Sequence, residues 1–234
     1  NRIRCIASCI IYGQLKKIDY GVKWIILNDY KKNNHILNCP FNMLFKNKIE
    51  VKKIDSKDKT YGTHYLIIEG FNICNGFNKF SSKCQKKFIP SDPKRRNIDF
   101  MYNDIPDKIK QQYINAFKVL KPIDKLQVKI DDFSKKFNQY TISIHIRSWN
   151  RKGEGGRRSL FKINKFEDKM KEYDKKYNFY LASDSSSVIN YFKNNSSLKD
   201  RILIYPRQSS LNNSRDFPEG VQEDLIELYL LSKN

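Results

Sequence analysis

Hydrophobic and polar positions along the chain follow two different periods, and together they predict an α/β protein. Near the N-terminus five apolar residues recur at helical spacing: Ile3, Ile6, Ala7, Ile10 and Ile11. They indicate a helix over residues 2–17. A continuous apolar run at 22–27 predicts a buried strand, and further short strands are predicted at 49–54 and 65–69. Residues 70–104 are rich in Asn, Lys, Ser and Pro without a clear period, so we predict a loop there.

The pattern becomes more regular after residue 105. Two helices are predicted at 106–120 and 123–137, with Pro122 between them. Strands and helices then alternate, in the order strand 140–146, helix 164–177, strand 179–183, helix 186–193, strand 201–205 and helix 219–231. This alternation predicts right-handed crossovers and a parallel sheet. We therefore expect two halves, with a boundary between residues 105 and 138.

The composition is that of a globular protein. In 234 residues, 39% hydrophobic and 13% aromatic content is enough to bury one large core or two small ones. The longest apolar runs, such as Trp24-Ile25-Ile26-Leu27, fall far short of the roughly 20 residues that a membrane-spanning helix needs. We therefore expect no membrane span in this chain. Because the first residue is Asn1 rather than Met, we interpret the chain as a mature or partial product.

The net charge of +20 is the strongest compositional signal. Clustered Lys and Arg would favour a nucleic-acid partner, because they neutralise phosphates. Here the lysines are spread along the whole chain among Asn and Ile residues, so a solvated basic surface is the favoured interpretation. Attraction to an anionic ligand or glycan comes second. Nucleic-acid binding comes third, and we expect no nucleic-acid partner.

The cysteines give no sign of a metal site. All five lie within the first 84 residues: Cys5, Cys9, Cys39, Cys74 and Cys84. None forms a CxxC pair or alternates with His at metal-ligand spacing, so we expect no metal. The odd count fits reduced thiols in a cytosolic setting, and one or two disulfides remain an alternative.

The predicted parallel sheet directs attention to the residues that follow each strand. In open parallel sheets, ligands bind beyond the carboxyl ends of the strands. The strand at 140–146 runs into His145-Ile146-Arg147, and a basic, Gly-rich stretch follows at 148–158. The planar guanidinium of Arg147 suits a diphosphate, and glycines let backbone approach a ligand closely. The alternative is a basic surface loop beside a satisfied core histidine.

The next two strand ends also carry polar residues. After the strand at 179–183, Asp184 has the chemistry to bind a ribose or sugar hydroxyl. The alternative is that this segment only caps the next helix, through Ser185 or Ser186. After the third strand come Pro206-Arg207-Gln208 and, beyond a loop, a helix that starts at Gly220. Its leucines form a core stripe, and its acidic residues are by default ordinary helix surface.

Three motifs together resemble the shared peptide signatures of fucosyltransferases. They are the HxR motif at 145–147, the Ala-Ser-Asp motif at 182–184 and the Gly-Val helix that ends in Leu231-Ser232. The N-terminal Asn1-Arg2-Ile3-Arg4 is similar to the end of a Gly-x-Gly-(N/D)-R-L-R segment, and Cys39 to Phe45 is similar to a further family stretch. The family includes α1,6-fucosyltransferases of N-glycan cores and rhizobial nodulation fucosyltransferases, with protein O-fucosyltransferases more distant. The resemblance implies a GT-B-like α/β fold, in which two Rossmann-like domains face a cleft and the C-terminal one holds a parallel sheet.

The resemblance also implies roles for individual residues. Arg147 and Glu154 take catalytic positions, the first at the donor diphosphate and the second as the base. The implied donor-binding residues are His145, Arg147, Asp184, Glu227, Asn1 and Arg2. Of these, His145 lies by the guanine nucleotide and Glu227 recognises guanine, whereas Asn1 begins a helix that directs backbone N–H groups to the diphosphate. The chain departs from the family where Ser148, Trp149 and Asn150 replace a second Arg and an Asp.

The function implied by this resemblance is inverting, metal-independent transfer of fucose from GDP-fucose to a glycan or glycoconjugate hydroxyl. It assigns 1–105 to an acceptor-side α/β domain, 106–137 to a helical connection and 138–234 to a nucleotide-sugar-binding domain that is incomplete at its C-terminus. A cytoplasmic enzyme is expected, the alternative being the secretory lumen with an anchor absent from this chain. The alternative functions are transfer of another nucleotide-activated deoxysugar, an inactive lectin-like domain, and nucleic-acid binding.

Overall fold

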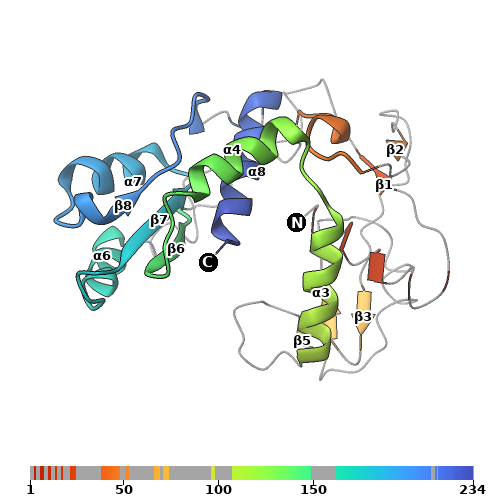
Figure 1. The fold of residues 1–234 in the computed structure, drawn as a ribbon, viewed down its shortest axis with the longest axis horizontal. Coiled ribbons are helices and arrows are strands. Elements are labelled where there is room, and N and C mark those ends of the chain that lie inside the picture. Colours follow the sequence, from red (N-terminus) through yellow and green to blue (C-terminus); the bar gives the residue numbers. More distant parts are fainter. Residues whose placement is uncertain are drawn as a thin grey trace. The chain divides into compact units, whose positions relative to one another are not determined.

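The structure is a computed structural model of the 234-residue chain (Figure 1). It describes residues 3, 6, 7, 10, 11, 14, 17, 22–24, 38–47, 51–52, 66–68, 71–73, 96–97, 107–148, 162–211, 214 and 216–233. The chain divides into two compact units. Unit 1 comprises Asn1–Ile25 and Phe45–Lys121, and unit 2 comprises Ile26–Leu44 and Pro122–Asn234. The functional domain boundaries drawn from the sequence stay a prediction.

Unit 1 begins with the predicted helix. The described positions 3, 6, 7, 10, 11 and 14 are helical, and four apolar residues of the predicted face are buried: Ile6, Ala7, Ile10 and Ile11. Strand β1 (Val22–Lys23) then pairs in parallel with β2 (Val51–Lys52). The helical and strand periods read from the sequence are therefore confirmed in these segments.

A second small sheet in unit 1 corrects the predicted loop at 70–104. Strand β3 (Leu66–Ile68) pairs antiparallel with β4 (Phe71–Ile73), and β4 pairs in parallel with β5 (Arg96–Asn97). The prediction of an uninterrupted loop was wrong for β4 and β5. Strands of two or three residues are too short to show a period, and their conformation depends on hydrogen bonds from a neighbouring strand.

The last helix of unit 1, α3 (Asp107–Val119), is fastened at its C-terminal end by Asn47. The Asn47 side chain donates a 2.6 Å hydrogen bond to the Val119 carbonyl and accepts one of 2.8 Å from the Lys121 N–H. The Lys46 N–H also donates to the Lys121 carbonyl at 2.9 Å. These bonds pair backbone groups that a helix end leaves without intrahelical partners.

Unit 2 contains the predicted parallel sheet. Its strands β6 (Thr141–Ile146), β7 (Asn178–Ser183) and β8 (Ile202–Leu203) are all parallel and lie in the order β6-β7-β8. The longer helices are α4 (Asp124–Ser134), α6 (Ile163–Lys171), α7 (Ser186–Asn190) and α8 (Pro218–Leu231), and short helical turns are η1 (Phe41–Met43), η2 (Tyr191–Asn195) and η3 (Lys199–Arg201). The α/β class and the parallel sheet predicted from the sequence are confirmed.

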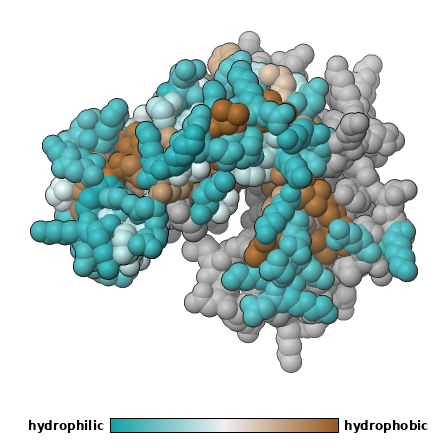
Figure 2. All heavy atoms as spheres, viewed as in Figure 1, coloured by the Kyte–Doolittle hydropathy of each residue, from teal (hydrophilic) through white to brown (hydrophobic). Residues whose placement is uncertain are grey.

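The central strand β7 is buried on both faces, so unit 2 has three layers (Figure 1). Phe179 and Leu181 join an apolar core with residues of α6 and α7. Tyr180, which points the other way, packs on the rings of Phe133 in α4 and of Phe137, which follows that helix, at centroid distances of 5.7 and 5.2 Å. Helix α8 packs on α4 and on the sheet. Hydrophilic residues cover most of the described surface in the view of Figure 2.

A buried carboxylate, Glu167 of α6, anchors the turns that follow α7. It accepts hydrogen bonds from the hydroxyls of Tyr191, Ser196 and Ser197 and from the Ser197 N–H. Burial alone would raise the pKa of Glu167, but these hydrogen bonds outweigh burial and lower the pKa from 4.5 to about 2. The ionised form is therefore bound more strongly in the folded chain than in the unfolded one.

We expect the substitution Glu167→Ala to lower the free energy of unfolding by about 1–3 kcal/mol, because it leaves the buried Ser196 hydroxyl without its acceptor. The decrease in the free energy of unfolding should have its full size above pH 4.5 and should become smaller as the pH falls toward 2, because folding lowers the pKa of this carboxyl. Urea denaturation across this pH range measures both effects. The matched control is Glu172→Ala, because the Glu172 side chain is 60% exposed and pairs only with Lys169 among the described contacts. An equal loss of stability in this control would contradict the role assigned to Glu167.

Candidate functional site

The sheet of unit 2 places three sequence segments at one edge. Because β6, β7 and β8 are parallel, their carboxyl ends lie at the same side of the sheet. His145, Arg147 and Ser148 stand at the end of β6, Asp184 directly follows β7, and Arg207 comes four residues after β8. This is the edge at which open α/β sheets bind ligands.

Asp184 connects the ends of β6 and β7. Its Oδ1 accepts a 2.7 Å hydrogen bond from the backbone N–H of Ser148, a residue that is only 1% exposed. The sequence left two alternatives after β7, a hydroxyl-binding role for Asp184 and helix capping alone by Ser185 or Ser186. The structure adds a third function, in which Asp184 fixes the backbone after Arg147. Ser185 does occupy the N-cap position of α7, but its hydroxyl bonds the Ser187 hydroxyl at 2.7 Å and makes no side-chain cap bond.

His145 is not the buried core histidine that the sequence allowed as an alternative. More than a third of the residue is exposed to solvent. Partial loss of hydration lowers the pKa of His145 below 6.5, an effect that Asp184 opposes and Arg147 reinforces. The imidazole is therefore neutral at pH 7, with one nitrogen as a donor and the other as an acceptor.

Arg207 forms a buried ionic cluster that the sequence analysis did not predict. Its Nη1 lies 2.6 Å from Glu227 Oε2 and 2.8 Å from Asp224 Oδ1, and its Nη2 donates to the Gly220 carbonyl at 3.2 Å. The guanidinium side chain is only 8% exposed. The interpretation of the α8 acidic residues as ordinary helix surface was wrong for Glu223 and Glu227, which are buried.

Glu223 holds the loop that carries Arg207. It accepts hydrogen bonds from the backbone N–H groups of Gln208 at 2.7 Å and Ser209 at 3.0 Å, and from the Ser209 hydroxyl. Gly220, one turn earlier on α8, lies so close to Ser214 that a Cβ would stand 2.2 Å from the Ser214 carbonyl oxygen. Any larger residue at position 220 would therefore displace this loop or the helix start.

Glu227, implied by the resemblance to recognise guanine, belongs to the Arg207 cluster. Burial raises the pKa of Glu227, Arg207 lowers it, and Asp224 and Glu223 raise it, with a net value of about 7. The pKa of this carboxyl is thus raised into the neutral range, and Arg207 is the group that favours its ionised form. The sequence signal for this cluster is an arginine that follows a strand, together with acidic residues at positions 223, 224 and 227 of the next helix. Position 227 is four and three residues after the other two, so the three side chains lie on one side of the helix.

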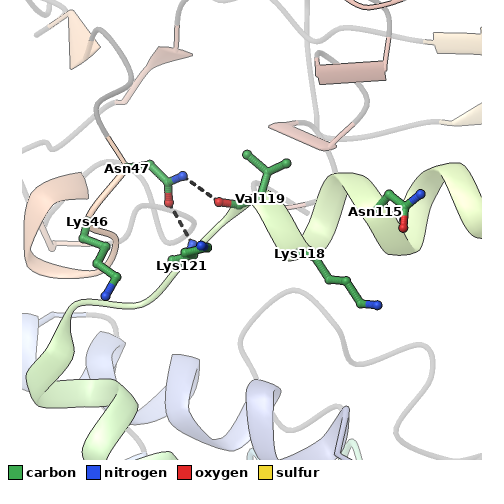
Figure 3. A pocket seen from close by; sticks show the side chains of 6 residues that line it. All are labelled: Lys46, Asn47, Asn115, Lys118, Val119 and Lys121. Carbon is green, nitrogen blue, oxygen red and sulfur yellow. Dashed lines mark hydrogen bonds between the residues drawn. The ribbon is translucent and has the colours of Figure 1, made fainter.

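Unit 1 contains a separate basic pocket of about 590 Å³ (Figure 3). It is lined by Lys46, Asn47, Asn115, Lys118, Val119 and Lys121. Three ammonium groups and no carboxylate line it, so it has the charge to attract an anion. Figure 3 shows the Asn47 amide turned toward Val119 and Lys121, where its hydrogen bonds close the end of α3.

Three predicted site residues, Asn1, Arg2 and Glu154, lie outside the described residues. The structure brings together His145, Arg147 and Asp184 and places Glu227 in the Arg207 cluster on α8. Within the described part of the chain, no group of three or more His, Cys, Asp or Glu residues is arranged to hold a metal ion. No helix among the described segments is long and apolar enough to cross a membrane.

We expect Asp184→Ala to accelerate hydrogen exchange of the Ser148 amide roughly tenfold, because it removes the acceptor that holds this N–H. Asp184→Asn should keep most of the protection, since its amide oxygen can accept the same bond. Amide exchange measured by NMR distinguishes the two variants. Equal exchange in the wild type and Asp184→Ala would show that the bond does not fix the backbone after Arg147.

Comparisons with known proteins identify the fold. No protein-family model and no curated protein sequence matches the chain. Among solved structures, it is similar to NodZ α1,6-fucosyltransferase co-crystallized with GDP, with a TM-score of 0.53 and 15% identity over 99% of this chain and 80% of that one. A selenomethionine structure of fucosyltransferase NodZ from Bradyrhizobium matches with a TM-score of 0.52, 15% identity and the same coverage, 99% and 80%.

These similarities confirm, at the level of the fold, the resemblance that the sequence motifs predicted. The three-stranded parallel sheet of unit 2 and its flanking helices belong to an α/β architecture that this chain shares with NodZ fucosyltransferases.

Proposed function

We propose that this chain is a glycosyltransferase that transfers fucose from GDP-fucose to a hydroxyl of a glycan or glycoconjugate. The observation that supports it most is the position of Arg147 at the carboxyl edge of a parallel sheet, in a chain whose fold is similar to that of a fucosyltransferase co-crystallized with GDP. The proposal includes the GT-B-like arrangement of an acceptor-side domain (1–105), a helical connection (106–137) and a nucleotide-sugar domain (138–234). It also includes a cytoplasmic location.

In this proposal, the end of β6 binds the donor phosphates. The planar guanidinium of Arg147 donates to two diphosphate oxygens at once, which a single ammonium group cannot do with the same geometry. The bond from the Ser148 N–H to Asp184 fixes the backbone next to Arg147. The second oxygen of Asp184 is then available to a ribose or sugar hydroxyl.

The guanine base is recognised by His145 and Glu227. His145 is neutral at pH 7, so it offers a hydrogen-bond donor and an acceptor without adding a charge beside the base. An ionised Glu227 accepts hydrogen bonds from the N1–H and the 2-amino group of guanine. A base without these two donors would leave the carboxylate unpaired, which gives selectivity.

Transfer itself is assigned to Glu154 as the general base. The bond between the anomeric carbon and the diphosphate breaks while the acceptor oxygen attacks from the opposite face, the acceptor proton passes to Glu154, and GDP leaves. This single displacement inverts the anomeric configuration. Arg147 stabilises the charge on the departing diphosphate, and the helix that begins at Asn1 and Arg2 adds backbone N–H donors.

We expect Arg147→Ala to weaken GDP binding roughly hundredfold and to abolish donor hydrolysis and transfer, because it removes a charge-assisted bidentate contact. Isothermal titration with GDP and product analysis with GDP-fucose measure the two effects. Lys175→Ala is the charge-matched control, since Lys175 is exposed in the turn after α6 and should leave both unchanged. Retained transfer in Arg147→Ala would remove this residue from the proposed role.

A thermal-shift screen separates this proposal from its alternatives. Stabilisation by GDP-fucose above UDP- and dTDP-sugars supports the proposal, whereas a preference for another nucleotide sugar indicates a different transferase. Binding of donor without consumption indicates an inactive lectin-like domain. Steeply salt-dependent affinity for nucleic acid, with no nucleotide-sugar response, would replace the proposal with a nucleic-acid-binding function.

We also expect transfer to persist in excess EDTA, because the proposed mechanism neutralises the leaving diphosphate with guanidinium groups. The initial rate is measured with and without about 1 mM chelator. Mg²⁺ or Mn²⁺ is then added in molar excess over the chelator, at roughly millimolar concentration, which is well above ordinary site affinities. Loss of activity in EDTA with recovery on metal addition would contradict a metal-independent reaction.

A further inference from the structure

One buried cation in unit 2 faces three carboxylates. Arg207 is within ion-pair distance of Glu223 at 3.7 Å, Asp224 at 2.8 Å and Glu227 at 2.6 Å. With all groups ionised the cluster has a net charge of −2, since one positive charge meets three negative ones. Such a cluster is stable only if the cation stays in place or a carboxylate takes up a proton.

The surroundings of Glu227 leave Arg207 as its only neutralising neighbour among the described residues. From α8 itself come Glu223 and Asp224, which repel its charge. Tyr180 of β7 and Tyr205, which follows β8, also lie close to Glu227. Their rings pack on the Phe133 ring of α4 at centroid distances of 5.7 and 5.5 Å. The Tyr180 hydroxyl is fully buried and has no hydrogen-bond partner within the described part of the chain.

The position of Arg207 is determined by its other contacts. Its Nη2 donates to the Gly220 carbonyl at 3.2 Å and to the Ser209 hydroxyl at 3.3 Å. Glu223 holds the same loop through the N–H groups of Gln208 and Ser209. Arg207 therefore presents Nη1 to Glu227 Oε2 from a fixed direction, and Glu227 Oε1 makes no hydrogen bond within the described residues.

The protonation state of Glu227 matters for the base that it is proposed to bind. An ionised carboxylate accepts hydrogen bonds from both the N1–H and the 2-amino group of guanine. A protonated carboxyl carries an O–H donor on one oxygen, so this oxygen faces a donor of the base instead of accepting from it. Burial and two neighbouring carboxylates favour the protonated form, and Arg207 opposes them. Without Arg207, Glu227 would be protonated at neutral pH.

We propose that Arg207 is a positioning residue that keeps Glu227 ionised and oriented, and thereby gives the site its preference for a guanine nucleotide. The proposal rests on the proposed function, because it takes Glu227 as the group that contacts the base. Arg207 itself contacts neither phosphate nor base in this role, since both of its terminal nitrogens, Nη1 and Nη2, already donate to protein groups.

The test compares GDP and IDP binding, by isothermal titration from pH 5.5 to 9, in the wild type, Arg207→Lys and Arg207→Met. IDP lacks the 2-amino group.

In the wild type the GDP preference should decline as the pH falls through about 7, where Glu227 takes up a proton. Arg207→Met should lose roughly threefold in GDP affinity at pH 7.5, lose the preference over IDP, and regain part of both at pH 9, since raising the pKa of Glu227 from about 7 by about one unit lowers its ionised fraction at pH 7.5 about threefold. Arg207→Lys should fall between the two.

Arg201→Met is the matched control, because Arg201 is also a partly buried arginine of unit 2, but it bonds the backbone carbonyls of Tyr177 and Asp174. A loss caused by general destabilisation would appear in this control as well and would lower GDP and IDP binding equally at every pH. Glu227→Gln should lack the preference at all pH values.

An independent measurement uses no nucleotide. Carbon-13 NMR of the glutamate carboxyls should show that Arg207→Lys raises the pKa of Glu227. An unchanged pH profile and GDP preference in both Arg207 variants would overturn the proposal while leaving the transferase function intact. If the wild-type chain binds no guanine nucleotide at all, the proposed function fails and the assignment of Arg207 fails with it.

Discussion

The parallel register between β6 and β7 is the constraint on which the proposed donor site depends. It pairs all six residues of one strand with six of the other, from Thr141 opposite Asn178 to Ile146 opposite Ser183. Both strands therefore end at the same level, and Ser148 meets Asp184 one residue beyond the last pair on the β7 side. A shift of one residue would turn each side chain to the opposite face and would separate these two groups.

The same sheet explains why unit 2 tolerates so much buried charge. Phe179 and Leu181 fill the core on one side of β7, and Tyr180 packs on aromatic rings on the other, so the strand is held without help from the polar edge. Arg207 and the buried carboxylates of α8 then pair with one another beside this sheet. Burying such groups costs free energy unless each is paired, which ties the loop at 206–209 firmly to α8.

The sequence predicted those features that depend on local pattern. The helix near the N-terminus, helices α3 and α4 and the alternating elements of unit 2 follow from the periods of apolar residues, and the HxR and Ala-Ser-Asp motifs were correctly placed at adjacent strand ends. Strands β4 and β5 were missed because two or three residues carry no period. The Arg207 cluster was missed because it joins residues 20 positions apart through a loop, and a helix pattern alone cannot show which acidic residues are buried.

The balance of charge at the carboxyl edge has a consequence for donor binding. Among the described residues, the edge carries the cations Arg147 and Arg207 and the anions Asp184, Glu223, Asp224 and Glu227. Arg207 is already bound to carboxylates, so its charge does not attract a diphosphate. The chain's net charge of +20 is therefore not concentrated among these groups. In the proposed function, a bound diphosphate needs Arg147 together with further cations, and the sequence places Arg151, Arg157 and Arg158 shortly after it. In this proposal, phosphate binding and guanine recognition thus depend on different arginines, which is why substitutions at 147 and 207 should differ in their dependence on pH and on the base.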